Sequence, residues 1–271
     1  MNDASLNGKI AFVTGGRQGI GRAIVETLAG AGAAVAAVDA NPAVADLAAE
    51  IGHGPSGGDV IGLRADVTSG PDVAAAVAQA NQRLGRVDIL VNNAGIVGRT
   101  RAFSWDGDDE VWLRTIDVNL VGTYRVTKAV VPQMIEARAG RVINVSSISG
   151  KQGSLGNSAY SASKHGVIGL TRTLAQEFAA LQLGELTANA VCPGVTDTPL
   201  VHEEGGLVDG VAALTGESRE VVMEKYILTQ SLQHRLLDAQ EVADMVLYLA
   251  SDRARGITGQ AINVCGGSVF Y

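Results

Sequence analysis

The chain has 271 residues, of which 46% are hydrophobic and 18% charged, and its 28 acidic and 21 basic side chains give a net charge of −7. This length and apolar content allow a sizeable buried core and exclude an intrinsically disordered protein. The negative charge and the aromatic content of only 4% argue against nucleic acid as a partner. Phosphate binding needs a basic surface, and base stacking needs aromatic side chains.

Two cysteines and four histidines show no spacing typical of a disulfide framework or a metal site. The first residues show no basic n-region or cleavage site, and no segment approaches the roughly 20 apolar residues that span a bilayer. We therefore expect a cytoplasmic protein with no metal and no membrane partner.

Short β-branched segments alternate with longer segments rich in alanine and leucine. Their apolar spacing predicts strands and helices in turn. In chain order, the predicted elements are a strand at 9–14, a helix at 19–31, strands at 34–39 and 60–64, a helix at 71–84, a strand at 88–91, a helical stretch at 109–138 that breaks near Asn119, a strand at 141–146, a helix at 158–181, a strand at 187–192, a helix at 239–250 and a strand at 261–264.

This alternation predicts an α/β fold, because strands that are apolar on both sides belong in a parallel sheet with helices on both faces. Right-handed crossovers make it a doubly wound, Rossmann-type sheet. We expect one domain over residues 1–271, with a loop-rich insertion at about 198–230 that forms a lid over the substrate. In such sheets ligands bind beyond the carboxyl ends of the strands.

A glycine-rich turn, TGGRQGIG at residues 14–21, follows the first predicted strand and opens a helix. Glycines permit a tight turn and a close approach of the backbone to a pyrophosphate, while the helix N-terminus offers free N–H groups. The context of strand, turn and helix supports dinucleotide binding. The residues predicted to bind are Gly15, Arg17, Gln18, Gly19, Ile20 and Gly21.

Asp39 ends the second predicted strand. A carboxylate there accepts hydrogen bonds from the adenosine ribose hydroxyls and repels the additional phosphate of NADP. Arg17 argues in the opposite direction, since a nearby arginine can bind that phosphate. We expect NAD rather than NADP; the alternative role for Asp39 is a turn or helix cap before Asn41-Pro42.

Further cofactor contacts are predicted after the third and fourth strands. Asp66, followed by Val67, can place a carboxylate against adenine. Asn93, Ala94 and Gly95 are small or polar and leave room for the nucleotide.

The reacting centre is predicted at Tyr160 and Lys164, which lie on one helix face because they are four residues apart. A free tyrosine has a pKa of about 10, and a nearby cation stabilises its phenolate. Ser147 follows the strand 141–146, where its hydroxyl can bond a substrate oxygen whose charge changes during hydride transfer. The turn after the strand 187–192 closes the nicotinamide side with Pro193, Gly194, Val195, Thr196 and Thr198.

Together these motifs resemble the short-chain dehydrogenase/reductase family along essentially the whole chain. The matching pieces are TGGRQGIG at 14–21, Asp39, DV at 66–67, NNAG at 92–95, DVNLVG at 117–122, Ser147, YSASK at 160–164 and PG at 193–194.

The resemblance implies that Tyr160 is the general acid/base, that Lys164 lowers its pKa and holds the nicotinamide ribose, and that Ser147 orients the substrate oxygen. It implies that Asn119 holds a helix kink and a water that relays protons from Lys164. Gln18 stands where NADP-dependent relatives often have arginine, which also favours NAD. The relatives are commonly homotetramers, so a homotetramer is implied here too.

We expect hydride transfer between NAD and a secondary alcohol or its ketone. The layout resembles 3-hydroxybutyrate dehydrogenases, but Val97, Ser149 and Asn157 replace the Gln, His and Lys that hold a carboxylate there, and the loop at 202–204 is acidic. A neutral polyol, sugar or cyclic alcohol is therefore the predicted substrate. One alternative is an NADPH-dependent 3-oxoacyl thioester reductase, against which Asp39 and the negative charge argue. The other is a non-catalytic dinucleotide-binding regulator, against which the four intact catalytic positions argue.

Overall fold

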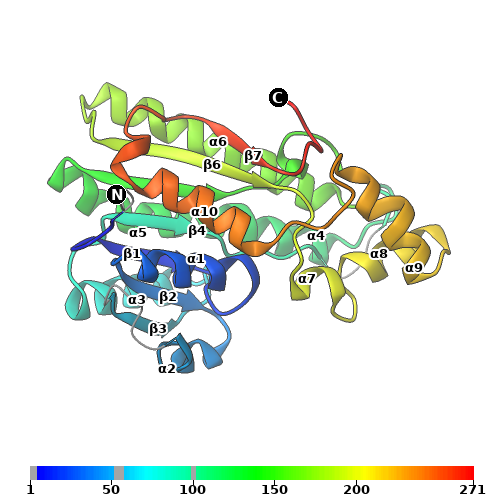
Figure 1. The fold of residues 1–271 in the computed structure, drawn as a ribbon, viewed down its shortest axis with the longest axis horizontal. Helices are drawn as coiled ribbons and strands as arrows, with labels where there is room; N and C mark the ends of the chain where they lie inside the picture. The colour runs from blue at the N-terminus through cyan, green and yellow to red at the C-terminus, as the bar shows by residue number, and fades with distance from the viewer. Residues whose placement is uncertain (1–4, 52–57, 99–101) are drawn as a thin grey trace.

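The computed structural model describes residues 5–51, 58–98 and 102–271, which include a sheet of seven parallel strands in the order β3-β2-β1-β4-β5-β6-β7 (Figure 1). The strands are β1 (Ile10–Thr14), β2 (Ala34–Asp39), β3 (Val60–Arg64), β4 (Ile89–Asn92), β5 (Gly140–Val145), β6 (Leu186–Pro193) and β7 (Ala261–Val264).

Helices cover both faces of this sheet (Figure 1). They are α1 (Gly19–Gly30), α2 (Leu47–Ile51), α3 (Gly70–Arg83), α4 (Asp109–Ile116), α5 (Gly122–Ala137), α6 (Ser158–Ala180), α7 (Pro199–His202), α8 (Leu207–Thr215), α9 (Arg219–Val222) and α10 (Ala239–Ala250). Short 3₁₀ turns lie at Pro42–Asp46, Ile148–Gly150, Leu228–Gln230 and Asp252–Ala254, and π-helical turns lie at Asp117–Val121 and Met223–Ile227.

Alternating strand residues build two apolar layers, one on each face of the sheet. Phe12 and Leu90 belong to the layer that α3, α5 and α6 complete. Val13 and Val91 belong to the opposite layer, which α1 and α10 complete. Each central strand is buried on both faces, which is the pattern of a parallel sheet between helices. The predicted doubly wound fold is confirmed.

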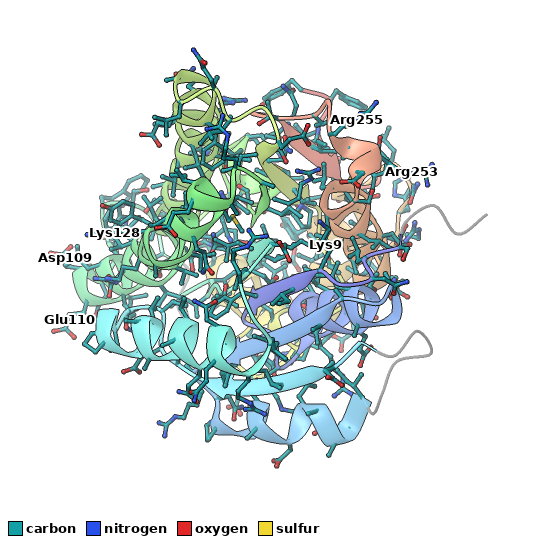
Figure 2. The ribbon with its side chains drawn as sticks, turned by 90° about the vertical axis from the view of Figure 1, so that its left-hand side faces the viewer. Lys9, Asp109, Glu110, Lys128, Arg253 and Arg255 are labelled. Atoms are coloured by element: carbon teal, nitrogen blue, oxygen red, sulfur yellow. The ribbon has the colours of Figure 1, made fainter. Side chains whose placement is uncertain are left out.

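Charged side chains lie on the outer faces of the covering helices. Asp109 and Glu110 at the start of α4 and Lys128 on α5 are exposed and point away from the sheet (Figure 2). On α5 the buried residues Val126, Val130 and Met134 face the sheet instead, because helical spacing separates the two sides.

The chain departs from the predicted elements in three places. One is α2, since no helix was predicted between the strands at 34–39 and 60–64. The predicted helical stretch at 109–138 is α4, a π-helical turn and α5, so the expected break near Asn119 is a widened turn and not a gap. The predicted loop-rich segment at 198–230 instead contains α7, α8 and α9. These short helices form because their apolar side chains bury one another in a separate cluster: Val201, Val208, Val211, Val222 and Ile227.

The strand order reverses between β1 and β4, since β2 and β3 follow on one side of β1 and β5 to β7 on the other side of β4. This arrangement opens a crevice at the carboxyl ends of the strands. Thr14 connects the two strands at that point, where its Oγ1 accepts hydrogen bonds from the backbone N–H of Asn93 at 3.0 Å and of Ala94 at 3.1 Å.

Leu28 tests the layer between α1 and the sheet, because its side chain is fully buried there. We expect Leu28→Ala to lower the free energy of unfolding by about 2–5 kcal/mol in a denaturant titration, through lost apolar contacts and the cavity that remains. Leu181→Ala is the matched control, since Leu181 is 54% exposed and should cost less than about 1 kcal/mol. Equal effects of the two substitutions would contradict the assignment of Leu28 to the core.

Candidate active site

A cleft of about 610 Å³ lies at the carboxyl ends of the strands, and the segment that follows β6 forms one of its walls. Figure 1 shows α7, α8 and α9 beyond that end of the sheet. The cleft is lined by every residue predicted to contact the cofactor and by Ser147. Asn119, the remaining predicted residue, is fully buried behind the wall. The fold therefore brings the predicted residues to one place, whereas their roles stay predictions.

The glycine turn after β1 has the conformation that close approach of a ligand requires. Gly15 and Gly19 have positive φ angles of 65° and 54°, which favour glycine. A Cβ atom on Gly21 would overlap the carbonyl oxygen of Gly15. Asn93, which directly follows β4, stabilises this turn. Its Nδ2 donates to the carbonyl oxygens of Thr14 at 3.1 Å and of Gly15 at 3.0 Å. These contacts leave the turn and the start of α1 open to a pyrophosphate.

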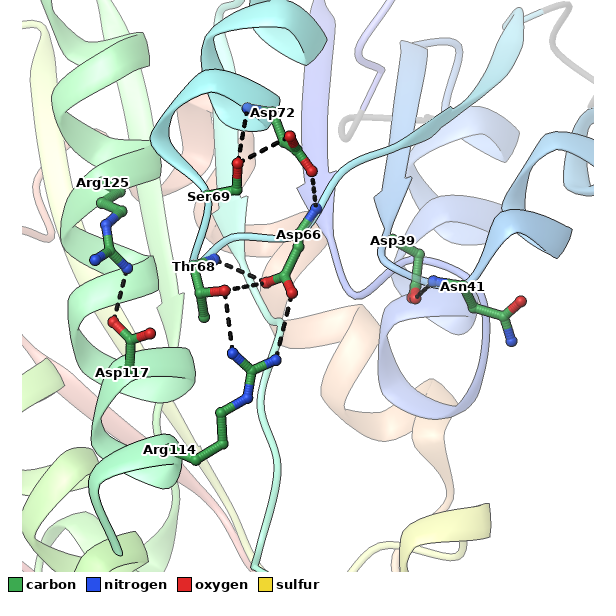
Figure 3. Close-up of polar contacts among 9 residues, drawn as sticks. All are labelled: Asp39, Asn41, Asp66, Thr68, Ser69, Asp72, Arg114, Asp117 and Arg125. Carbon is green, nitrogen blue, oxygen red and sulfur yellow. Dashed lines mark hydrogen bonds and ion pairs between the residues drawn. The ribbon is translucent and has the colours of Figure 1, made fainter. Parts of the chain in front are cut away.

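Asp39 lies against this turn at the end of β2. Its Oδ2 accepts a hydrogen bond from the backbone N–H of Arg17 at 3.2 Å. Its Oδ1 accepts one from the backbone N–H of Asn41 at 2.9 Å (Figure 3). The carboxylate thus has the turn-capping role that was the alternative prediction. It also lines the cleft, where its bonding to the ribose stays a prediction.

Asp66 is held by neighbours at the end of β3 (Figure 3). Its Oδ1 accepts from the Thr68 backbone at 2.8 Å and from Thr68 Oγ1 at 2.7 Å, and Arg114 Nη2 lies 3.3 Å from Oδ2. Partial burial raises the pKa of this carboxyl, but the bonds from Thr68 and Arg114 outweigh burial and lower the pKa overall. The sequence did not indicate Arg114, which reaches Asp66 from α4 and lines the cleft.

Lys164 is the most deeply buried charged group of the site, with 4% of its surface exposed. Its Nζ donates to the carbonyl oxygen of Val145 at 2.8 Å and lies 5.6 Å from the centre of the Tyr160 ring. Burial lowers the pKa of this ammonium group to about 8, because the charged form loses its hydration. The i, i+4 spacing on α6 thus places the ammonium and the tyrosine ring together, as predicted.

Ser147 and its neighbour Ser146 make different hydrogen bonds, and only Ser147 has its hydroxyl bonded to its own turn. The Ser147 hydroxyl accepts a hydrogen bond from the backbone N–H of Ser149 at 3.1 Å and faces the cleft. Ser146 Oγ donates to the carbonyl oxygen of Lys164 at 2.9 Å and so fastens α6 to the end of β5. Sequence analysis missed Ser146, and the only available signal was its position directly before Ser147.

Asn119 connects the π-helical turn to the wall of the cleft. Its Oδ1 accepts from Ile96 N at 2.8 Å, while its Nδ2 donates to Ile96 O at 2.9 Å and to Ser163 Oγ at 3.1 Å. A Cβ atom on Gly95 would lie 3.3 Å from Asn119 Oδ1 and 3.4 Å from Lys164 Nζ. Glycine at this position therefore leaves the space in which Asn119 and Lys164 approach each other.

The acidic loop at 202–204 was expected to disfavour an acidic substrate, but it does not line the cleft. His202 pairs with Asp197 at 2.7 Å, and within the described residues neither His202 nor the following glutamates line the cleft. The acidic loop thus cannot repel an acidic substrate by direct contact. The neighbouring apolar residues Leu200, Val201 and Leu207 line the cleft instead, whereas Glu203 and Glu204 are exposed.

Comparison with known proteins agrees with this geometry. The model of the short chain dehydrogenase family matches residues 9–206. The chain belongs to this family. Within it, a Streptomyces virginiae protein named as a candidate ketoacyl reductase of the monensin polyketide synthase is 40% identical over 264 residues, which is 96% of each chain. The 3-oxoacyl-[acyl-carrier-protein] reductase FabG of Thermotoga maritima is 36% identical and covers 98% of this chain and 99% of its own.

Two solved structures of short-chain dehydrogenases superpose closely on this one. A single-residue variant of actinorhodin polyketide ketoreductase with NADPH has a TM-score of 0.88 at 36% identity and covers 97% of this chain and 98% of its own. Levodione reductase has a TM-score of 0.87 at 30% identity and covers 98% and 99%. The family is one of oxidoreductases that use nicotinamide cofactors.

The residues present fit such a cofactor. Gly15, Gly19 and Gly21 line the cleft without a side chain, and a Cβ atom on Gly95 would crowd Lys164 Nζ at 3.4 Å. Asp39 borders the same cleft. In the described parts of the chain, no three His, Cys, Asp or Glu residues are grouped as a metal site would require. None of the helices in those parts is long and apolar enough to cross a membrane.

The buried ammonium of Lys164 predicts a pH dependence of stability. Its ordinary pKa of 10.5 applies in the unfolded chain, and about 8 applies in the folded chain. Between these values the unfolded chain binds more protons, so the free energy of unfolding should rise with pH, by up to about 1.4 kcal/mol per pH unit. Denaturant titrations of cofactor-free protein should show this rise relative to Lys164→Met. A difference between the two proteins that stays constant across this range would contradict the assignment.

Proposed function

We propose that the chain is a ketoreductase that transfers hydride between a nicotinamide cofactor and an uncharged ketone with an apolar body, the class that includes 3-oxoacyl thioesters and polyketide-type ketones. The observation that carries the proposal is the apolar wall of the cleft that Ser147 and Tyr160 also line. The names of the relatives support the same class, because the monensin, FabG and actinorhodin proteins are all described as ketone-reducing enzymes.

The apolar wall comes from the segment after β6. The side chains that contribute to it are Val195, Leu200, Val201, Leu207, Val211, Leu214 and Ile227. A polyol or sugar would place hydroxyl groups against these side chains, and each buried hydroxyl without a partner costs about 1–3 kcal/mol. The wall therefore favours an alkyl or carbocyclic body over the polyol that the sequence alone suggested.

The charge distribution of the cleft favours an uncharged substrate. Among the described residues that line it, the charged ones are Arg17, Asp39, Asp66, Arg114 and Lys164. Lys164 belongs to the reacting centre, and the other four lie where β1, β2 and β3 end. The wall formed by α7 and α8 contributes no charged side chain to pair with a substrate carboxylate.

The bound cofactor supplies or accepts the hydride, and the side chains of the chain manage the proton. Tyr160 donates its phenolic proton to the substrate oxygen, and Lys164 stabilises the phenolate that results. Ser147 stabilises the same oxygen: the Ser149 N–H occupies one acceptor position of its Oγ, so the hydroxyl donates its own proton toward substrate. Asn119 holds the segment that follows β4 in position through its bonds to Ile96, next to Gly95, which adjoins Lys164.

The cofactor we propose is NADH rather than NADPH. Asp39 supports this preference, because its carboxylate borders the cleft beside the glycine turn and would repel a 2′-phosphate. The actinorhodin ketoreductase structure contains NADPH, so this preference would separate the chain from that relative. The homotetramer and the cytoplasmic location stay predictions.

A panel of substrates tests the proposal. Oxidation of NADH should be measured with the N-acetylcysteamine thioester of 3-oxobutanoate and with cyclohexanone derivatives, and reduction of NAD⁺ with sugars and polyols. We expect kcat/KM for the best apolar ketone to exceed that for the best polyol by at least about 100-fold. Preferential oxidation of polyols would contradict the proposed substrate class.

Tyr160→Phe is the matched catalytic variant, since it removes only the hydroxyl. It should lower kcat for every active substrate by about 10²–10⁴-fold while the fluorescence titration with NADH stays unchanged. Full activity of this variant would contradict the proton-donor role.

A further inference from the structure

Arg17 borders the cofactor cleft, but its guanidinium group is bound elsewhere. Its Nη2 lies 3.0 Å from Glu50 Oε1 and its Nη1 lies 3.2 Å from Glu50 Oε2, a two-pronged pair with both carboxylate oxygens. The side chains of Arg17 and Glu50 are 23% and 35% exposed, so the pair is partly shielded from water.

The same carboxylate binds a second arginine. Arg22 Nη1 donates to Glu50 Oε2 at 2.7 Å, and Arg22 Nε donates to Glu26 Oε1 at 2.8 Å. Two guanidinium groups and two carboxylates thus form a closed group without net charge. We call Arg17, Arg22, Glu26 and Glu50 the arginine–glutamate group.

Glu50 is held at this position by the packing of α2. The Leu47 side chain of α2 is fully buried, and so is Val44 in the preceding turn. Gly62 lets that turn lie directly on β3, because a Cβ atom there would overlap the Val44 carbonyl oxygen. The carboxylate therefore reaches the glycine turn from a packed element.

The arginine–glutamate group lies beside Asp39, whose Oδ2 bonds the backbone N–H of Arg17. Arginine binds phosphate with the same two-pronged geometry that it uses for a carboxylate, so Glu50 and a 2′-phosphate would compete for one guanidinium group. A 2′-phosphate that displaced Glu50 would also leave that carboxylate with Arg22 as its remaining partner among the described interactions.

We propose that Glu50 is a specificity-determining residue for the cofactor, because it withholds Arg17 from a 2′-phosphate. Asp39 then excludes NADPH by repulsion, and Glu50 excludes it by occupying the cation that would otherwise bind it. This inference rests on the NADH preference of the proposed function.

Direct binding tests the proposal without turnover. Adenosine 2′,5′-bisphosphate and 5′-AMP differ only in the 2′-phosphate, and calorimetry gives their affinities for Asp39→Asn and for Asp39→Asn/Glu50→Gln. We expect the second variant to bind the bisphosphate about tenfold tighter than the first, since one charged contact with phosphate becomes available. Its affinity for 5′-AMP should change by less than about twofold.

Glu26→Gln in the Asp39→Asn background is the matched control, because Glu26 bonds Arg22 and has no contact with Arg17 among the described interactions. It should leave the affinity for the bisphosphate within about twofold. Adding Arg17→Met to Asp39→Asn/Glu50→Gln should abolish the gain. Thermal unfolding of each variant checks that the fold is retained.

An unchanged bisphosphate affinity in Asp39→Asn/Glu50→Gln overturns the role of Glu50, as does a gain that persists with Arg17→Met. Both results leave the proposed function intact. A preference of the unaltered chain for NADPH in the turnover assay contradicts the proposed cofactor instead, so the two failures are distinguishable.

Discussion

The burial of the Lys164 ammonium group is the constraint on which the geometry of the site depends. Its hydrogen-bond partner at 2.8 Å is the carbonyl oxygen of Val145, a dipole and not a carboxylate. Removing a charge from water without a full counter-charge is unfavourable, which is why burial lowers its pKa. Below that pKa the group is charged, and because a carbonyl does not neutralise the charge, it can stabilise a phenolate. The surrounding fold must hold the ammonium group in place.

The structure meets that constraint with polar contacts that connect α5 and α6 to the centre of the sheet. Asn92 Nδ2 donates to Asn144 Oδ1 at 2.9 Å and to Thr127 Oγ1 at 3.0 Å, and Asn144 Nδ2 donates to Thr171 Oγ1 at 2.8 Å. Thr171 lies on α6, the helix that also carries Lys164. Because all four side chains are buried, each contact restricts the position of a helix against the strands more strongly than an exposed contact would.

The parts of the molecule that follow from local pattern were predictable from the sequence. The bounds of β2, β3, β7 and α10 agree with the predicted ranges, because apolar periodicity and turn residues define them. The glycine turn, Ser147, Tyr160 and Lys164 were predicted from local spacing and strand ends, and they line one cleft, whereas their roles stay predictions. The segment at 198–230 was not predictable in this way, because its short helices form only against one another and over the cleft. The pairing of Arg17 with Glu50 was not predictable either, since the two residues are 33 positions apart and meet only through the packing of α2. In the sequence, Arg17 suggested binding of the 2′-phosphate of NADP. Its pairing with Glu50 argues against that interpretation, because the guanidinium group is already bound.

The most direct test of this account is the titration of Lys164 itself. In cofactor-free protein labelled with ¹³C in the lysine side chains, the Lys164 Cε signal is assigned by its absence in Lys164→Met and followed as the pH is raised. We expect a midpoint at about 8, because the ammonium group is buried against a backbone carbonyl. A midpoint at the ordinary value of 10.5 would show that the ammonium group keeps its hydration or has a counter-charge, and it would contradict the uncompensated burial on which this description of the site depends.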